Sequence, residues 1–137
     1  MRIFLFFIIS IILLGCNNQE TNTSVEEENS SSLSGVPNFD KFYYRFHTDT
    51  AFQLAHINFP LEGIPSNYGE TDIDIEKHKW QKEGWKHHSL ITSKEFTSTF
   101  QVLDETLITE FIIHEKGQMG MKRRFSKSDD GWFMIYY

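Results

Sequence analysis

A short apolar run that ends at a cysteine limits how much of this chain can fold into a domain. The run Ile3–Leu14 is apolar except for Ser10, and Met1-Arg2 before it supplies a positive charge. Signal peptides carry an apolar core of about 7 to 15 residues, whereas a membrane-spanning helix needs about 20. The run is followed by a lipobox, the sequence that bacterial signal peptidase II cleaves before a cysteine that receives lipid: Leu13, Leu14, Gly15 and Cys16. We therefore predict a lipoprotein signal peptide at residues 1–15 and lipid attachment, palmitate included, at Cys16.

Cys16 is the only cysteine of the chain, so no internal disulfide can form. A thiol in a lipobox serves acylation, and several acyl chains together hold a protein stably on a membrane surface. The predicted membrane partner is therefore reached through lipid, and the domain itself is expected to be soluble.

Residues 16–35 contain the lipidated cysteine and then a polar linker rich in Asn, Ser and Glu. Val25 and Leu33 are its only sizeable apolar residues, too few to offset the entropy of ordering the segment. Asn17 is not the aspartate that retains lipoproteins in the inner membrane of enteric bacteria, which favours the outer membrane. Because the acidic cluster starts only at Glu26, away from the cysteine, exposure to the periplasm is favoured over surface display.

The remaining residues, 36–137, are enough for one domain with one core. Without Arg2, 12 basic residues face 19 acidic ones, a net charge of −7 that argues against nucleic-acid partners. The one basic cluster, residues 122–124, is expected on a strand with a single stem directed inward.

The first part of this domain has helical patterns. Phe39, Phe42, Tyr43 and Phe46 share the spacing of one helical face, and Pro37-Asn38 precedes them as a start signal. A capping box at Thr50–Gln53 predicts a second short helix, which must end before Pro60. Residues 62–69 read as a loop.

The middle of the domain gives weaker patterns. Residues 72–76 alternate polar and apolar, which predicts a strand with Ile73 and Ile75 directed inward. A second capping box at Thr92–Glu95 predicts another short helix, with Phe96 and Phe100 on one side.

Alternation dominates from Leu107 onward and predicts strands over 107–114, 119–125 and 132–137, the last two joined by a tight turn at 128–131. Helices followed by an antiparallel meander indicate the α+β class, with N-terminal helices packed on a curved antiparallel sheet that forms a cone. The residues expected to line the core or a pocket of this cone are mostly aromatic: Phe42, Tyr43, Phe46, Phe52, Trp80, Trp85, Phe111, Trp132 and Met134.

Several runs resemble one known family: residues 39–46, 49–53 and 58–61, with Trp80 and the closing Gly131-Trp132. Together they resemble the Bacteroidetes lipoproteins with domain of unknown function 4348, over essentially all of residues 36–137. The resemblance implies a nuclear-transport-factor-2-like, or cystatin-like, fold and brings no catalytic motif.

The sequence shows no recognisable catalytic, metal or cofactor motif. No HExxH, nucleophile elbow or phosphate-binding glycine loop is present, and adjacent His87-His88 on a strand could not ligate one ion. We therefore predict no metal and no cofactor. Some proteins of the implied fold use an acid or base inside the cone, and the available groups of that type are Tyr43, Tyr44, His87, Asp104 and His114.

Three functions remain open at this point. The leading hypothesis is a non-enzymatic binding domain in the cell envelope that takes a small apolar ligand, a peptide or an envelope protein. The second is a small-molecule isomerase or lyase of the same fold. The third is a structural envelope protein whose sheet forms a homodimer.

Overall fold

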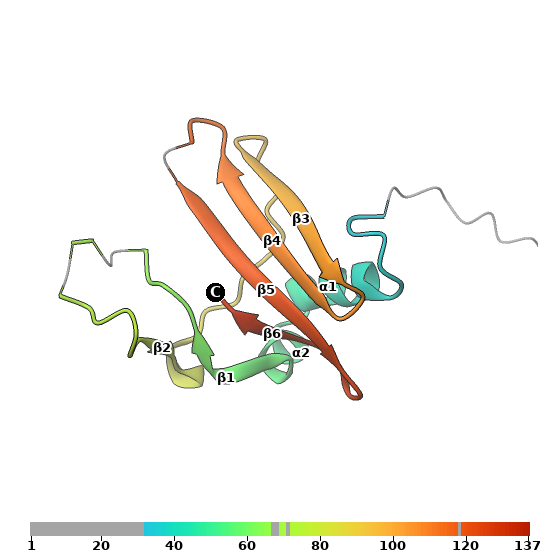
Figure 1. The fold of residues 1–137 in the computed structure, drawn as a ribbon, viewed down its shortest axis with the longest axis horizontal. Helices are drawn as coiled ribbons and strands as arrows, with labels where there is room; N and C mark the ends of the chain where they lie inside the picture. Colours follow the sequence, from blue (N-terminus) through green and yellow to red (C-terminus); the bar gives the residue numbers. More distant parts are fainter. Residues whose placement is uncertain (1–31, 67–68, 71, 118) are drawn as a thin grey trace, which may run out of the picture. The chain divides into compact units, whose positions relative to one another are not determined.

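The computed structural model describes residues 32–137 except 67, 68, 71 and 118 (Figure 1). The predicted signal peptide, the lipobox with Cys16, and the linker as far as residue 31 lie outside the described residues. No helix in the described part of the chain is long and apolar enough to cross a membrane. The elements in chain order are α1 (Phe39–Thr48), α2 (Thr50–Ala55), β1 (Ile57–Glu62), β2 (Lys79–Trp80), the 3-10 turn η1 (Lys82–Gly84), β3 (Phe96–Asp104), β4 (Leu107–His114), β5 (Gly120–Ser128) and β6 (Gly131–Tyr136).

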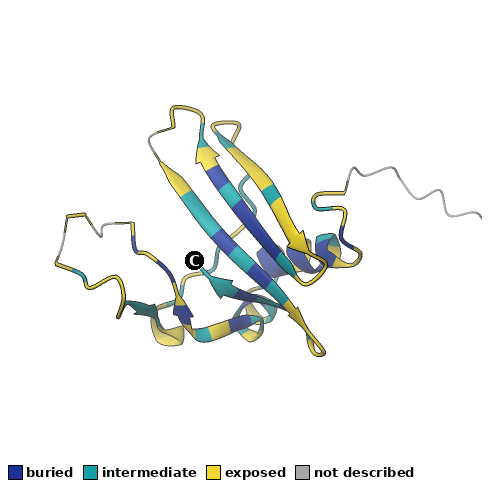
Figure 2. Cartoon of the chain, in the orientation of Figure 1, coloured by how far each residue is buried: buried dark blue, intermediate teal, exposed yellow. Residues whose placement is uncertain are grey.

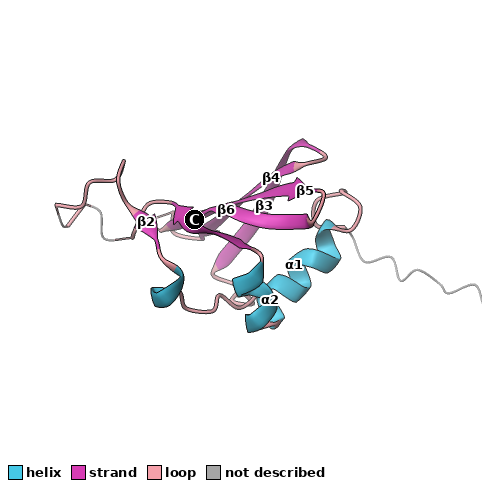
Figure 3. Cartoon of the chain, turned by 90° about the horizontal axis from the view of Figure 1, so that it is seen from below, coloured by secondary structure: helices cyan, strands magenta, loops and turns pink. Residues whose placement is uncertain are grey.

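The six strands form one sheet in the order β2-β1-β6-β5-β4-β3. The strands β4 to β6 make the expected antiparallel meander, and β3 extends it by one strand. Strand β1 joins β6 in parallel, so the sheet is mixed and not wholly antiparallel. Strand β1 thus lies between β2, with which it pairs antiparallel, and the last strand β6, with which it pairs in parallel. Both helices lie on one face of the sheet (Figure 3). The α+β class is confirmed.

Helix α1 buries the aromatic face that its spacing predicts. Phe39, Phe42, Tyr43 and Phe46 are all buried, whereas Tyr44 between them is 64% exposed. Helix α2 is also confirmed, but its N-cap is Asp49, one residue before the predicted capping box. The Oδ1 atom of Asp49 accepts a hydrogen bond from Phe52 N at 2.9 Å. Gln53 therefore does not close a capping box, and its side chain is free to bond elsewhere.

Two predicted elements are wrong. Residues 96–104, expected to begin with a helix, form strand β3, because a spacing of four between Phe96 and Phe100 fits one face of a strand as well as one face of a helix. Eight residue pairs with β4 then decide in favour of the strand. Residues 72–76 form no strand: Asp74 O accepts from Lys77 N and His78 N in a turn, and Ile75 is 39% exposed.

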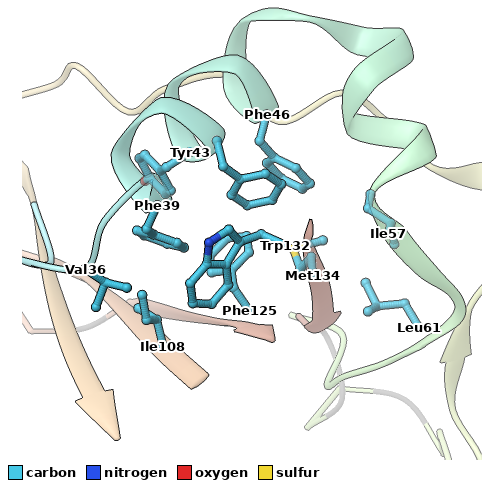
Figure 4. Packing of buried hydrophobic residues seen from close by; sticks show 11 residues of the cluster. Val36, Phe39, Tyr43, Phe46, Ile57, Leu61, Ile108, Phe125, Trp132 and Met134 are labelled. Carbon is cyan, nitrogen blue, oxygen red and sulfur yellow. The ribbon is translucent and has the colours of Figure 1, made fainter. Parts of the chain in front are cut away.

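The core lies between the helices and the sheet. Figure 2 shows the buried positions along β4 and β5, and Figure 4 shows Phe39, Tyr43 and Phe46 above Phe125, Ile108 and Trp132. The ring centroid of Phe39 lies 5.0 Å from that of Trp132 and 5.5 Å from that of Phe125, and both pairs have edge-on geometry. Aromatic pairs in this arrangement contribute beyond their buried area.

Candidate functional site

A buried polar cluster joins helix α1 to the middle of the sheet. Tyr43 Oη donates to Glu110 Oε1 at 2.6 Å, and Arg123 binds Glu110 through Nε to Oε2 at 2.8 Å and through Nη2 to Oε1 at 3.1 Å. Arg123 Nη2 also lies 3.3 Å from Tyr43 Oη. Glu110 is 0% exposed and Arg123 is 1% exposed. Both carboxylate oxygens are satisfied, so the cluster is a closed structural network and not a free acid or base.

Burial, and after it the charge of Arg123, sets the protonation of Tyr43 and His47. Burial raises the pKa of Tyr43 far above its usual value, although the Arg123 charge opposes the shift. The hydroxyl therefore stays protonated and donates a hydrogen bond to Glu110. Burial, with Arg123 nearby, lowers the pKa of His47 to about 3. His47 Nδ1 therefore donates to His88 O at 2.7 Å as a neutral ring.

Gln53 fixes the loop that follows η1. Its amide nitrogen donates to Phe46 O and His88 O, and its Oε1 accepts from Trp85 Nε1 at 3.1 Å and from His88 N at 2.9 Å. Trp85 stacks on His88 with 4.7 Å between ring centroids. The fully buried Gln53 thus holds residues 85–88 against the helices. Residues 91–93, which follow this fixed segment, line the cleft described next.

An apolar cleft of about 880 Å³ opens at the end of the sheet beyond the polar cluster. It arises because β6 is shorter than β5: Tyr136 pairs with Arg124, so residues 120–123 of β5 have no β6 neighbour. Its lining combines the loop after β1, the end of β2, the loop before β3 and the ends of four strands: Ile64, Pro65, Ser66, Trp80, Ile91, Thr92, Ser93, Phe96, Ile112, Met119, Gly120, Met121, Lys122, Tyr136 and Tyr137.

Gly63 permits the close approach that forms one wall of the cleft. Ile64 N donates to Tyr137 O at 3.0 Å, and Tyr137 N donates to Glu62 O at 2.9 Å. A Cβ at Gly63 would collide with the carbonyl oxygen of Tyr137. Only glycine therefore lets the chain turn here and place Ile64 and Pro65 beside Tyr137.

The cleft offers few groups for acid–base chemistry. Among the side chains of its described lining residues, those of Lys122 and the two tyrosines are titratable, and no carboxylate or imidazole side chain is present. Burial raises the pKa of Tyr137, which keeps its hydroxyl protonated. The described residues also contain no group of three or more His, Cys, Asp or Glu placed to hold a metal ion. The cleft therefore suits an apolar ligand, and Lys122 places one positive charge at its edge.

The residues predicted to line a core or pocket fall into three places. Phe42, Tyr43, Phe46, Trp132 and Met134 are buried in the core, and Phe52, Trp80 and Trp85 pack against it while half-buried. Phe111 differs, because it pairs with Lys122 on the opposite face of the sheet. Of the nine, Trp80 alone lines the cleft.

The acid–base candidates from the sequence do not converge. Tyr43 is locked to Glu110, Tyr44 and Asp104 are exposed, and His114 lies beside Glu95, with 4.0 Å between His114 Nε2 and Glu95 Oε2. His87 Nε2 lies 3.2 Å from His47 O, away from the cleft lining.

Sequence reasoning missed the cleft residues Ile91, Phe96, Met119 and Met121, and the Glu110–Arg123 pair. A signal for the pair existed: Glu110 stands between Ile108 and Ile112, and Arg123 between Met121 and Phe125, in the registers of inward-facing residues. A charge in such a register requires a partner of opposite sign.

Comparison with known proteins identifies the fold alone. The solved structure of a cystatin-like protein from Bacteroides caccae matches with a TM-score of 0.51 and 21% sequence identity, over 72% of each chain. No family model and no curated protein matches. The chain therefore has an α+β fold of the cystatin-like kind, in agreement with the fold expected from the sequence.

Proposed function

We propose that this protein is a lipid-anchored bacterial envelope protein whose domain binds an apolar ligand in the cleft and does not transform it. The observation that carries the proposal is the lining of the cleft, which is mostly aliphatic and aromatic. Its volume lies within the range of small-molecule and peptide sites, about 300–1,000 Å³. The ionisable groups that an isomerase or lyase would use do not meet in the cleft: Tyr43 is held in the closed network, and the other four lie outside the cleft lining, Tyr44 and Asp104 exposed and His87 and His114 half-buried.

The proposal includes the anchor and the compartment predicted from the sequence. Cys16 carries the lipid, the outer membrane is the favoured membrane, and the domain faces the periplasm. The lipobox at Leu13–Cys16 and the polar linker after it are the sequence features that support this placement.

Replacing the lipobox cysteine tests the anchor. We expect Cys16→Ala to abolish incorporation of radiolabelled palmitate in the bacterial host and to shift the chain out of the membrane fraction, because the acylated thiol is missing. Asn17→Ala, next to the same site, should be labelled as the wild type is. Labelled Cys16→Ala protein would contradict the predicted attachment site.

A charge at the rim of the cleft tests ligand binding. Met119 lines the cleft and is 61% exposed, so Met119→Glu should fold normally while placing a carboxylate against an apolar ligand. We expect the occupancy of a copurified ligand, measured by native mass spectrometry of the full chain released from detergent, to fall about fivefold or more.

Leu103→Glu is the matched control for this experiment. Leu103 on β3 is 54% exposed and lies outside the cleft lining, so the same substitution there should leave occupancy unchanged. Equal losses in the two variants would show that binding does not occur in the cleft, and a wild-type chain that retains no ligand and binds no added apolar molecule would refute the proposed function.

A further inference from the structure

One wall of the apolar cleft is a free strand edge. Strand β5 begins at Gly120, but its first residue paired with β6 is Arg124, opposite Tyr136. Residues 120–123 pair only with β4 on their other side. After Tyr136 the chain turns away, because Tyr137 bonds to Glu62 of β1.

The hydrogen-bond alternation of an antiparallel pair shows which backbone groups are free. His114 N donates to Met119 O at 3.0 Å, which makes 114–119 a hydrogen-bonded pair. Bonded and non-bonded pairs alternate, so Met121 and Arg123 direct their N–H and C=O groups towards β4. Gly120 and Lys122 therefore direct theirs towards the open side, where no described residue bonds to them.

From this free edge and the apolar cleft beside it, we infer that the ligand is an extended peptide segment that adds to β5 as an antiparallel strand in the line of β6. The inference rests on the proposed function and names the ligand class of the same cleft. Main-chain bonds to an exposed strand edge supply affinity in such complexes, and pockets for alternate side chains supply specificity. Four strand residues span about 13 Å, matching the unpaired length of β5.

The two sides of the added strand meet different chemistry. Side chains opposite Met121 would enter the cleft between Trp80, Ile91 and Phe96, which calls for apolar residues. Side chains opposite Lys122 would project to the other face of the sheet, at the rim of the cleft that Lys122 and Tyr136 form. There Lys122 Nζ lies 4.4 Å and Arg124 Cζ 5.8 Å from the centroid of the Tyr136 ring.

Charge complementarity at this second face selects acidic residues. Opposite charges directly across an antiparallel pair are favourable and like charges are unfavourable. Neither cation has a carboxylate partner among the described ion pairs. The partner is therefore a protein segment in which apolar and acidic residues alternate.

Backbone-methylated peptides test the strand addition without altering the protein. The probe is acetyl-Leu-Glu-Leu-Glu-Leu-amide, titrated against the full chain in phospholipid nanodiscs, with empty nanodiscs as the blank. In the inferred register the amides of its glutamates face Gly120 and Lys122. N-methylation of both glutamates should weaken binding about tenfold or more through lost backbone bonds, whereas N-methylation of the first and third leucines should not.

Hydrogen exchange resolved to single amides reports the same contact on the protein. Binding should protect the amides of Gly120 and Lys122, while those of Met121 and Arg123, bonded to β4, should change little. Lys122→Pro removes the free amide without removing a bond to β4, so it should abolish peptide binding. Lys122→Ala keeps the amide and should cost only the charge contact. A probe with lysine in place of glutamate should lose that contact and bind more weakly still, because like charges then face each other.

The outcomes separate the two proposals. Equal affinity for the two methylated peptides, or unchanged exchange at Gly120 and Lys122, would overturn the strand addition. If a neutral naphthylamine probe then still binds in a manner sensitive to Met119→Glu, the cleft takes a small apolar molecule and the proposed function stands. If neither probe binds, both fail. The titrations with the N-methylated peptides use the unaltered protein, so they test the inference even if Lys122→Pro does not fold.

Discussion

Glu110→Gln should lower the free energy of unfolding by about 3–5 kcal/mol, the largest loss that we expect from a change of nearly constant volume. The substitution removes the charge that Arg123 meets 2.8 Å away in an environment with no solvent access. Arg123 cannot release its proton at accessible pH, so its charge would stay buried without compensation. Urea denaturation followed by circular dichroism measures the change.

A paired replacement separates the cost of an orphaned charge from the net contribution of the network. Replacing a buried ion pair by apolar residues of similar volume is often close to neutral. We therefore expect Glu110→Leu combined with Arg123→Met to recover most of the stability that Glu110→Gln loses. A double variant as unstable as the single one would show that the polar geometry itself holds α1 on the sheet.

Glu62→Gln is the matched control. Its carboxylate is 2.6 Å from Lys79 Nζ, a distance similar to that of the buried pair, but both side chains reach solvent. Exposed pairs contribute little, because water and salt screen them. The control should therefore unfold close to the wild-type denaturant concentration, and a large effect there would mean that distance, and not burial, determines the loss.

The sequence was sufficient for elements whose residues follow a single period. Phe39, Phe42, Tyr43 and Phe46 fit only a helix, and the alternation through 107–114 fits only a strand, so α1 and β4 were predicted with bounds close to those observed. Phe96 and Phe100 fit both periods, and there the pairing with β4 decides. The alternation at 72–76 lacks a neighbouring strand, and a lone strand is not stable.

The cleft could not be predicted in the same way. Its lining comes from segments between residues 64 and 137. The cleft exists because β6 ends opposite Arg124 and leaves residues 120–123 at the start of β5 without a partner on that side. No local pattern encodes that difference in strand length. The parallel entry of β1 beside β6, which brings Ile64 and Pro65 to Tyr137, is equally a tertiary property.

The second large effect is expected at Trp132, the residue of β6 that fills the space under helix α1 (Figure 4). Trp132 is 4% exposed, and its ring centroid lies 5.0 Å from that of Phe39 and 6.5 Å from that of Phe42. Trp132→Ala removes these contacts and leaves a cavity that the surrounding rings cannot close, at a cost of about 3–5 kcal/mol. A melting temperature equal to that of the wild type would refute the role of Trp132 in the core.

Trp132→Phe separates ring packing from the indole N–H. Trp132 Nε1 is buried and has no hydrogen-bond partner among the described residues, so the N–H is a cost that phenylalanine removes while keeping an aromatic ring against Phe39. We therefore expect Trp132→Phe to lose less than half of what Trp132→Ala loses in thermal unfolding of the full chain. Tyr44→Ala, which truncates an aromatic residue 64% exposed on α1, should change stability by no more than about 0.5 kcal/mol. Equal losses for alanine and phenylalanine at position 132 would instead assign a structural bond to the indole N–H.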